Sequence, residues 1–266
     1  MAMRIPRISP FVLCAAIAVA SFVWISRPAP TQASTESSMA STILSLMNGD
    51  RVSLGLRALR VDSRLAGLAA DRAGWMASTG LMSHQSHGGD IPDAIRSRGV
   101  SAYSSGEAIG STNAGWGVGA AQYLYGLWKG SPEHWGLMMS STFNYIGVGF
   151  SQGNGQTFGS LVFAEAPDSS RPVAQMTGAG VSSQTVFFTW TGRDGLLQTH
   201  TAGLRDFDVQ YRVDGGSWIA LRTHTTSTQV ILGNRASGHT YAVRIRDRDA
   251  RDNLSGWTLP RTVRVR

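Results

Sequence analysis

Two histidines and a glutamate in the N-terminal half of the chain carry side chains that could do chemistry: His84, Glu107 and His134. Two neutral imidazoles and a carboxylate can hold a divalent metal such as zinc, and a metal with an open coordination position activates water. Without a metal, the carboxylate can orient an imidazole that acts as a general base. The same residue types also form hydrogen-bonded clusters that only fix loops. The residues alone leave these three interpretations open.

Four segments around these residues follow one another in a specific order. They are 46–84 (LMNGDRV through GLMSH), 105–110 (SGEAIG), 127–135 (LWKGSPEHW) and 145–150 (YIGVGF). In this order they resemble the CAP family, which comprises cysteine-rich secretory, antigen 5 and pathogenesis-related proteins, in its cysteine-free bacterial branch. The resemblance covers about residues 39–165.

The resemblance implies an α-β-α sandwich with a cleft in which the two histidines and the glutamate converge. It makes His84, Glu107 and His134 the candidate catalytic residues. It also makes His84 and His134 the candidate ligands of a divalent metal such as zinc. Because one fold hosts many functions, the resemblance does not decide whether the chain is an enzyme.

The chain departs from the family's pattern within this cluster. Family members with the complete set of four residues carry a second glutamate shortly after the tryptophan that corresponds to Trp128, and Ser131 stands there. We expect Glu133 to point away from the cleft, because it is adjacent to His134 on a helix. His87, beside two glycines, is expected to be a solvated loop residue rather than a further ligand. A reduced cluster favours ligand binding over catalysis.

The elements expected to position these residues are helices followed by a hairpin. Apolar residues recur at three- and four-residue steps over 39–78, with Asp62 or Ser63 as a helix cap. Further helices are predicted over 91–98, 120–128 and 132–139, a glycine-rich loop over 106–119, and an antiparallel hairpin from 145–151 and 158–165. Helices followed by a hairpin predict an α+β layered domain over 39–166.

Residues 173–266 are predicted to form an all-β sandwich after a polar linker at 167–172. Short alternating segments predict strands over 185–191, 207–213, 218–222, 228–232 and 241–246. The segments 207–218 and 239–258, together with Trp190 and Tyr241, resemble a fibronectin type III domain, which is an immunoglobulin-like sandwich. That resemblance implies a spacer or adhesion module.

The N-terminus has the pattern of a secretory signal peptide over 1–33. Two arginines precede an apolar run, and small residues precede an expected cleavage after Ala33, with 34–38 as a linker. Cleavage would remove Cys14, the single cysteine, and leave a mature chain without disulfides. We therefore expect a secreted, extracellular protein. The alternative is a membrane-anchored, extracytoplasmic protein whose apolar run stays uncleaved.

The net charge of +7 is concentrated in the C-terminal part. Residues 171–266 contain thirteen arginines and seven aspartates, whereas residues 34–170 are near neutral. A basic surface outside a cell attracts anionic cell-wall polymers, lipids or nucleic acid. The alternative is that arginine and aspartate alternate on exposed strands and keep the protein soluble. We expect no specific nucleic-acid partner.

These observations support three hypotheses from different classes. The first is a binding protein whose CAP-like cleft engages a lipid, glycan or cell-surface protein, with or without a divalent metal, while the sandwich positions it at the cell surface. The second is a metal- or His/Glu-dependent extracellular hydrolase acting on peptide or cell-wall material. The third is a structural envelope or adhesion protein whose cleft residues only stabilise loops.

Overall fold

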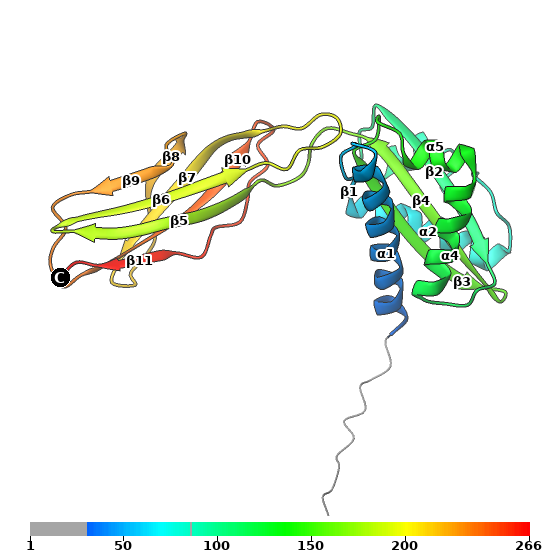
Figure 1. Cartoon of the computed structure of the whole chain (residues 1–266), viewed down its shortest axis with the longest axis horizontal. Helices are drawn as coiled ribbons and strands as arrows, with labels where there is room; N and C mark the ends of the chain where they lie inside the picture. Colours follow the sequence, from blue (N-terminus) through cyan, green and yellow to red (C-terminus); the bar gives the residue numbers. More distant parts are fainter. Residues whose placement is uncertain (1–30, 86) are drawn as a thin grey trace, which may run out of the picture. The chain divides into compact units, whose positions relative to one another are not determined.

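The structure is a computed structural model that describes residues 31–85 and 87–266 (Figure 1). Nearly all of the predicted signal peptide, with Cys14 and the apolar run, lies outside the described residues. The first described element is helix α1 (Gln32–Ser53), so the expected cleavage point after Ala33 and the expected linker 34–38 fall within a helix. The linker at 34–38 was predicted only from the position of the expected cleavage. In the structure these polar residues form the first turns of a helix that buries Met39. No helix in this described part is long and apolar enough to cross a membrane.

The N-terminal domain is built on one four-stranded sheet in the order β1-β3-β4-β2. Its strands are β1 (Arg60–Val61), β2 (Ser104–Thr112), β3 (Tyr145–Gly153) and β4 (Gln156–Glu165). Strand β1 runs parallel to β3, and the other neighbours pair antiparallel. Gly153 faces Gln156 at the end of the predicted hairpin, next to a turn formed by Asn154 and Gly155 with positive φ.

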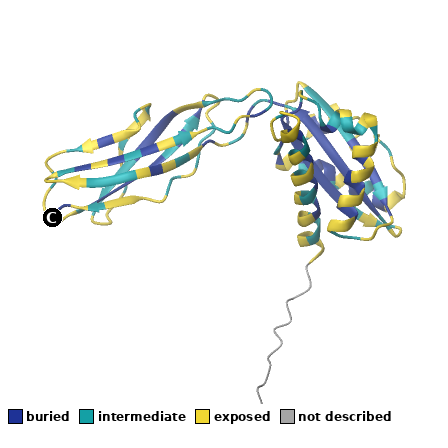
Figure 2. Ribbon diagram, in the orientation of Figure 1, coloured by how far each residue is buried: buried dark blue, intermediate teal, exposed yellow. Residues whose placement is uncertain are grey.

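Helices cover both faces of this sheet (Figure 1). Helices α1, α4 (Val118–Gly130) and α5 (Pro132–Met138) pack on one face around Trp128. Helices α2 (Ser63–Thr79) and α3 (Ile91–Ser97) pack on the other face around Leu68. Figure 2 shows the strands buried between helices whose outer sides are exposed. The predicted α+β class, with an α-β-α arrangement in this domain, is confirmed.

Helix α2 lies very close to β3 because three glycines of that strand face it. A Cβ atom at Gly147, Gly149 or Gly153 would lie 2.0, 2.1 and 2.1 Å, respectively, from backbone atoms of α2. These separations are far below van der Waals contact, and interiors are too densely packed to yield that space. Any larger residue at these positions therefore forces the helix away from the sheet.

Gly149→Ala is expected to destabilise the N-terminal domain by about 3 kcal/mol or more, because the added methyl group meets the helix backbone. Gly126→Ala in α4 is the matched control, since nothing lies within 4 Å of its Cβ position. The control should be neutral or stabilising by up to about 1 kcal/mol. Urea unfolding of both variants measures the effects. Equal stabilities would contradict the close packing of α2 on β3.

The glycine-rich segment expected as a loop over 106–119 instead begins as strand β2, which pairs with β4 along its whole length. Its glycines serve close packing. A Cβ atom at Gly106 would lie 2.6 Å from Leu137, and one at Gly110 would lie 3.0 Å from a tryptophan side chain of α4. Loops and close helix contacts both use glycine, so composition does not separate the two. The correction places Glu107 on a strand rather than on a loop.

A fully buried arginine of α1 anchors that helix to the rest of the domain. Arg51 donates hydrogen bonds to three backbone carbonyls at 2.8–3.0 Å, two of them from residues at the end of α5 and just beyond it. Burial lowers the pKa of Arg51 to about 10. Asn48, one turn earlier, exchanges two hydrogen bonds with the backbone of Leu59 at 2.8 and 3.0 Å.

Asp50 links α1 to α4. Its carboxylate accepts hydrogen bonds from the Lys129 ammonium group and from the Tyr125 hydroxyl at 2.6 Å each. The hydrogen bond from Lys129, followed by that from Tyr125, lowers the pKa of Asp50 below its ordinary value.

Because the pKa of Asp50 is lower in the folded chain, its stabilising contribution is present above the ordinary value of 3.8 and is lost as pH falls through the folded value. Asp50→Asn should therefore lower the free energy of unfolding by about 1 kcal/mol near neutral pH. The difference from the parent should shrink in strong acid. Urea unfolding at both pH values measures it, and a difference independent of pH would contradict the ion pair's role.

The C-terminal domain is a two-sheet sandwich, and the predicted all-β architecture is confirmed. One sheet has the order β5-β6-β9 and the other β11-β10-β7-β8. The strands are β5 (Val173–Ser182), β6 (Thr185–Arg193), β7 (Leu204–Val213), β8 (Ile219–Thr225), β9 (Gln229–Leu232), β10 (Thr240–Asp249) and β11 (Arg261–Arg264). Trp190 and Tyr241 are buried in the core between the sheets.

Strands β5 and β11 are absent from the five predicted strands. In β5 the register shifts between Met176 and Gly178, and two glycines interrupt the alternation of apolar and polar residues. Strand β11 is only four residues long and mostly exposed, so it carries a weak pattern.

Candidate functional site

Glu107 lies on β2 with its carboxylate buried against helix α2. The side chain is 1% exposed. It accepts hydrogen bonds from Arg72 through Nε at 2.5 Å and Nη2 at 3.1 Å, and from the Ser160 hydroxyl of β4 at 3.1 Å. A buried carboxylate is costly unless it is paired and hydrogen-bonded, and the guanidinium group supplies the opposite charge.

Arg72 of α2 is fully buried and also holds the turn that follows this helix. Its guanidinium donates to the backbone carbonyls of His84, His87 (3.1 Å) and Gly89 (3.0 Å). Sequence reasoning missed this residue. The available signal was a charged side chain on the apolar face of an amphipathic helix, where a charge needs a buried partner.

His84 contacts the same carboxylate from the turn. Its Nδ1 lies 2.9 Å from Oε2 of Glu107, and its side chain is 58% exposed. Of the two neutral tautomers, a carboxylate beside Nδ1 favours the one with hydrogen on Nδ1, which makes Nε2 the acceptor nitrogen. The pair is therefore an oriented imidazole, which can receive a hydrogen bond from a ligand or act as a general base.

The third candidate, His134, reaches the same place from α5. A pocket of about 350 Å³ is lined by His84, Glu107 and His134, with Leu137 and Phe143 as apolar wall. The structure thus brings all three candidate residues to one pocket. Their roles in binding or catalysis remain predictions.

Glu133 lines this pocket as well, contrary to the expectation that its position next to His134 turns it away. Helix α5 is one short segment of seven residues that begins after Ser131, whose hydroxyl accepts from the His134 amide at 3.5 Å. Successive residues of a helix differ by about 100° in direction, so two neighbours in the first turn can both border a wide opening. The pocket therefore contains two histidines and two glutamates.

These residues do not fit a metal held by His84 and His134. The Arg72 guanidinium donates to both oxygens of Glu107, and its positive charge opposes a second cation beside them. Among the described residues, one group of three His, Cys, Asp or Glu side chains has ligand atoms within 4.8 Å of one another, and it consists of aspartates of the C-terminal half. We therefore derive no zinc chemistry from the pocket.

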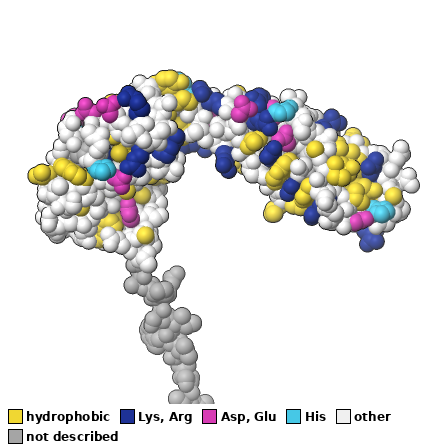
Figure 3. Space-filling view, turned by 180° about the vertical axis from the view of Figure 1, so that it is seen from behind, with side chains coloured by type: hydrophobic (Ala, Val, Ile, Leu, Met, Phe, Trp, Pro, Cys, Tyr) yellow, Lys and Arg dark blue, Asp and Glu magenta, His cyan; other side chains and the backbone are white. Residues whose placement is uncertain are grey.

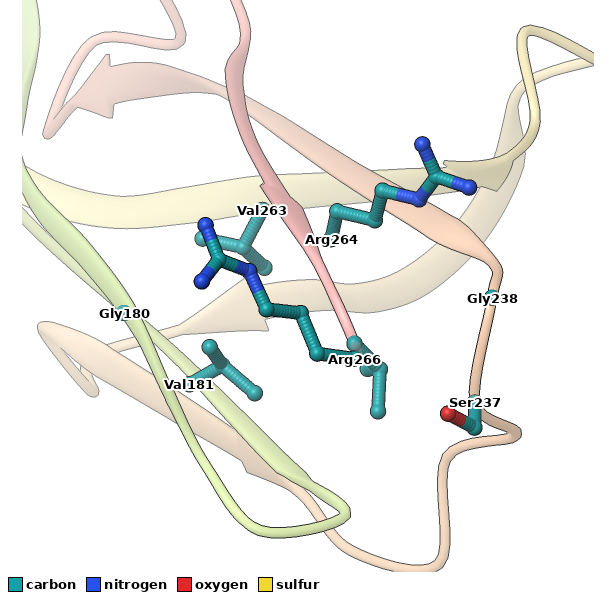
Figure 4. A pocket seen from close by; sticks show the side chains of 8 residues that line it. Gly180, Val181, Ser237, Gly238, Val263, Arg264 and Arg266 are labelled. Atoms are coloured by element: carbon teal, nitrogen blue, oxygen red, sulfur yellow. The ribbon is translucent and has the colours of Figure 1, made fainter.

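A second hollow of about 730 Å³ lies on the sandwich domain (Figure 4). Gly180 and Val181 of β5 line it together with Arg264 and Arg266. Figure 4 shows the two guanidinium groups reaching in different directions. No histidine, aspartate or glutamate belongs to its lining in the described part of the chain, so it offers none of the acid-base groups of the first pocket.

The CAP family model, described as the cysteine-rich secretory protein family, matches residues 44–164. Residues 44–164 are a CAP domain. The matched range contains the sheet almost completely and every residue of the His/Glu pocket. The sequence resemblance for this part of the chain is confirmed. No curated protein matches the chain.

Solved structures are similar to parts of this chain. An extracellular protein of Bacillus anthracis that contains an SCP domain matches with a TM-score of 0.44 and 23% identity, over 52% of this chain and 45% of that chain. An outer surface protein of Borrelia burgdorferi matches with a TM-score of 0.44 and 17% identity, over 48% of this chain and 92% of that chain. An Fn3-like protein of Clostridium thermocellum matches with a TM-score of 0.27 and 18% identity, over 36% of this chain and 96% of that chain. This chain thus spans less than half the length of the B. anthracis chain.

Arg72→Met is expected to lower the free energy of unfolding of the CAP domain by about 3–5 kcal/mol, because it leaves the Glu107 carboxylate buried without its cation. Adding Glu107→Gln to that variant should recover part of the loss. Arg96→Met is the control, since Arg96 pairs with Asp93 on the surface and should change stability by less than about 1 kcal/mol. Urea unfolding measures all three variants. A small loss for Arg72→Met would refute the buried pair as the support of the site.

Proposed function

We propose that the chain is an extracytoplasmic binding protein whose CAP domain holds a small polar group of a lipid, glycan or protein ligand. The sandwich domain would position the CAP domain at the cell surface. The observation that supports this proposal is the bonding of the Glu107 carboxylate. Its two oxygens already make hydrogen bonds with Arg72, Ser160 and His84. Its oxygens serve to orient the imidazole, so the pocket presents an arranged hydrogen-bonding surface rather than a free acid.

The size and lining of the pocket limit the group that it can take. About 350 Å³ is near the lower end of ligand pockets, which span roughly 300–1,000 Å³. This volume suits one sugar ring, a lipid headgroup or a peptide side chain. Leu137 and Phe143 offer an apolar wall, while His84 and Glu133 offer hydrogen-bonding groups of both kinds.

The proposed location rests on the signal pattern of residues 1–33 and on the match to a family described as secretory. The signal residues lie almost entirely outside the described part of the chain, so cleavage and anchoring stay alternatives.

The basic charge of the sandwich does not call for a nucleic-acid partner. The guanidinium groups of Arg212, Arg244 and Arg246 stack at 4.3–4.8 Å on the rings of Trp218 and Trp257. Figure 3 shows arginine side chains interspersed with aspartate and histidine over one face of this domain. Many arginines therefore have partners within the fold, which supports the expectation of no specific nucleic-acid binding.

One observation favours a second function. The 2.9 Å contact between His84 and Glu107 is the geometry of a carboxylate-oriented general base. The alternative is therefore a His/Glu-dependent hydrolase that acts on peptide or cell-wall material, without a metal in the pocket.

Binding of a panel of probes separates these functions. The panel contains a fluorescent sterol, a fluorescent fatty acid, peptidoglycan fragments and short peptides, and each incubation is also checked for cleavage by mass spectrometry. For a binding protein, at least one probe should bind saturably and emerge intact. His84→Ala and Leu137→Ala should weaken that binding about tenfold or more, a loss of about 1.4 kcal/mol.

His87→Ala is the matched control for His84→Ala, because His87 lies exposed in the same turn and only its backbone carbonyl bonds to Arg72. It should bind like the parent. Cleavage that disappears in His84→Ala would instead establish the hydrolase. If no probe binds or is cleaved, and the variants only lower the stability of the protein, the remaining hypothesis is that the cleft residues stabilise loops.

A further inference from the structure

Four aspartates lie where the linker meets the sandwich domain, three of them buried (Asp168, Asp247 and Asp249) and Asp194 half-buried. Asp168 lies in the linker after β4, Asp194 follows β6 directly, and Asp247 and Asp249 lie at the end of β10. One carboxylate oxygen from each of Asp168, Asp194 and Asp249 lies within 4.8 Å of the other two. The side chains therefore converge from three separate segments of the chain.

Two members of this cluster keep carboxylate oxygens without a donor. Asp247 is fully buried, and no hydrogen bond of ordinary geometry reaches its carboxylate oxygens from the described residues. The same holds for Oδ1 of Asp194, whose Oδ2 accepts from the Gly203 amide at 2.8 Å. Burial raises the pKa of both carboxyls, and the charge of Asp249 adds to the effect on each. The nearby Ser255 hydroxyl offsets part of the rise in the pKa of Asp247. Buried oxygens without a donor cost free energy, so this arrangement calls for a positive partner.

The other two carboxylates are held in place by neutral donors. Asp249 accepts from the backbone and side-chain N–H groups of Asn253 at 2.9 and 2.7 Å. Asp168 accepts from the amides of Ser170 and Ala202 at 2.8 and 2.9 Å. These bonds orient the carboxylates but add no positive charge.

The sandwich supplies arginines to its other buried aspartates. Asp206 and Asp208 of β7 are paired with Arg205 at 2.9 Å, Arg246 at 2.9 Å and Arg248 at 3.2 Å. Residues 171–266 contain thirteen arginines, yet no salt bridge within the described chain joins one of them to the four clustered aspartates. Within the described chain, the cluster's carboxylates therefore have no cationic side chain as partner.

We propose that Asp168, Asp194, Asp247 and Asp249 form a calcium site. Calcium binds carboxylate oxygens at about 2.3–2.6 Å, so oxygens around one ion can be as much as about 5 Å apart. The ligand oxygens of Asp168, Asp194 and Asp249, which lie within 4.8 Å of one another, fit this ion. Asp247 lies near enough for the charges of Asp194 and Asp249 to add to the effect of burial and raise its pKa. We therefore place Asp247 as the fourth ligand. Magnesium needs about 2.0–2.1 Å in a stricter octahedron and is seldom caged by protein alone. Zinc prefers histidine and cysteine ligands, which the cluster lacks.

The ion would fasten the linker to two loops of the sandwich. Asn253 already bridges these segments, because its side-chain N–H groups donate to the backbone carbonyl of Asp168 at 3.2 Å and to Asp249 at 2.7 Å. Calcium adds the charge that lets the carboxylates stay together when ionised. Extracellular modules hold calcium with dissociation constants of about 10⁻⁴ to 10⁻³ M, and we expect this range here.

The test compares the full chain, stripped with EGTA, with Asp194→Asn and with Asp252→Asn as matched control. Asp252 lies in the loop after β10, and its side chain is 72% exposed and paired with Arg205. Calorimetric titration with calcium chloride should give one saturable site in the parent and the control, and none in Asp194→Asn. Excess calcium should raise the parent's unfolding temperature by about 5 °C or more, and equal magnesium should not.

Asp194→Asn should also unfold at a higher temperature than the parent in EGTA, because it removes one of the repelling charges. Asp247→Asn replaces it if the first variant fails to fold. Absence of saturable calcium binding by the parent, or equal binding by the parent and the asparagine variant, overturns the proposal. Stabilisation by Asp194→Asn without calcium binding by the parent also overturns it, and would assign the cluster to carboxyls that share protons.

Discussion

The ion pair between Arg72 and Glu107 is the interaction on which the CAP-domain site depends. It joins α2 to β2 in the interior, and the same guanidinium group binds three carbonyls of the turn that carries His84. One side chain therefore fixes the carboxylate, the turn and, through the carboxylate, the imidazole. Glu107 and His84 are held by bonds within the domain, so a ligand meets these two groups already arranged and does not have to order them.

The parts of the fold that depend on local residues were predictable from the sequence. Periodicity and turn chemistry placed α2, α3 and the hairpin, and the ordered motifs placed the three candidate pocket residues. The rest depends on residues distant in the chain. Strand β2 was predicted as a loop because its glycines suggested a turn, whereas Gly106 is needed for close packing against Leu137. Arg72 was missed because its partner Glu107 lies 35 residues further along the chain. The direction of Glu133 depends on where a seven-residue helix sits against the sheet, which its own sequence does not encode.

The sandwich domain uses charged residues in two opposite ways. Both buried carboxylates of β7, Asp206 and Asp208, are paired with arginines of the same sheet. Two arginines of β10 lie over the rings of Trp218 and Trp257. The aspartate cluster at the linker has no such match among the described residues, although arginine is abundant nearby. The same arginine- and aspartate-rich composition therefore gives aspartates that are paired with arginine on β7 and a cluster of aspartates without such pairs near the linker. The net charge of the domain does not distinguish these two arrangements.

The glycines of β3 have a consequence for the order in which the CAP domain can form. Helix α2 ends at Thr79, but the strand that receives its backbone begins at Tyr145 and is complete only at Gly153. During synthesis from the N-terminus, the apolar face of α2 has no platform until that strand exists, and contacts so distant in sequence slow folding. We therefore expect the packing of α2 on the sheet to form only after the hairpin has been made.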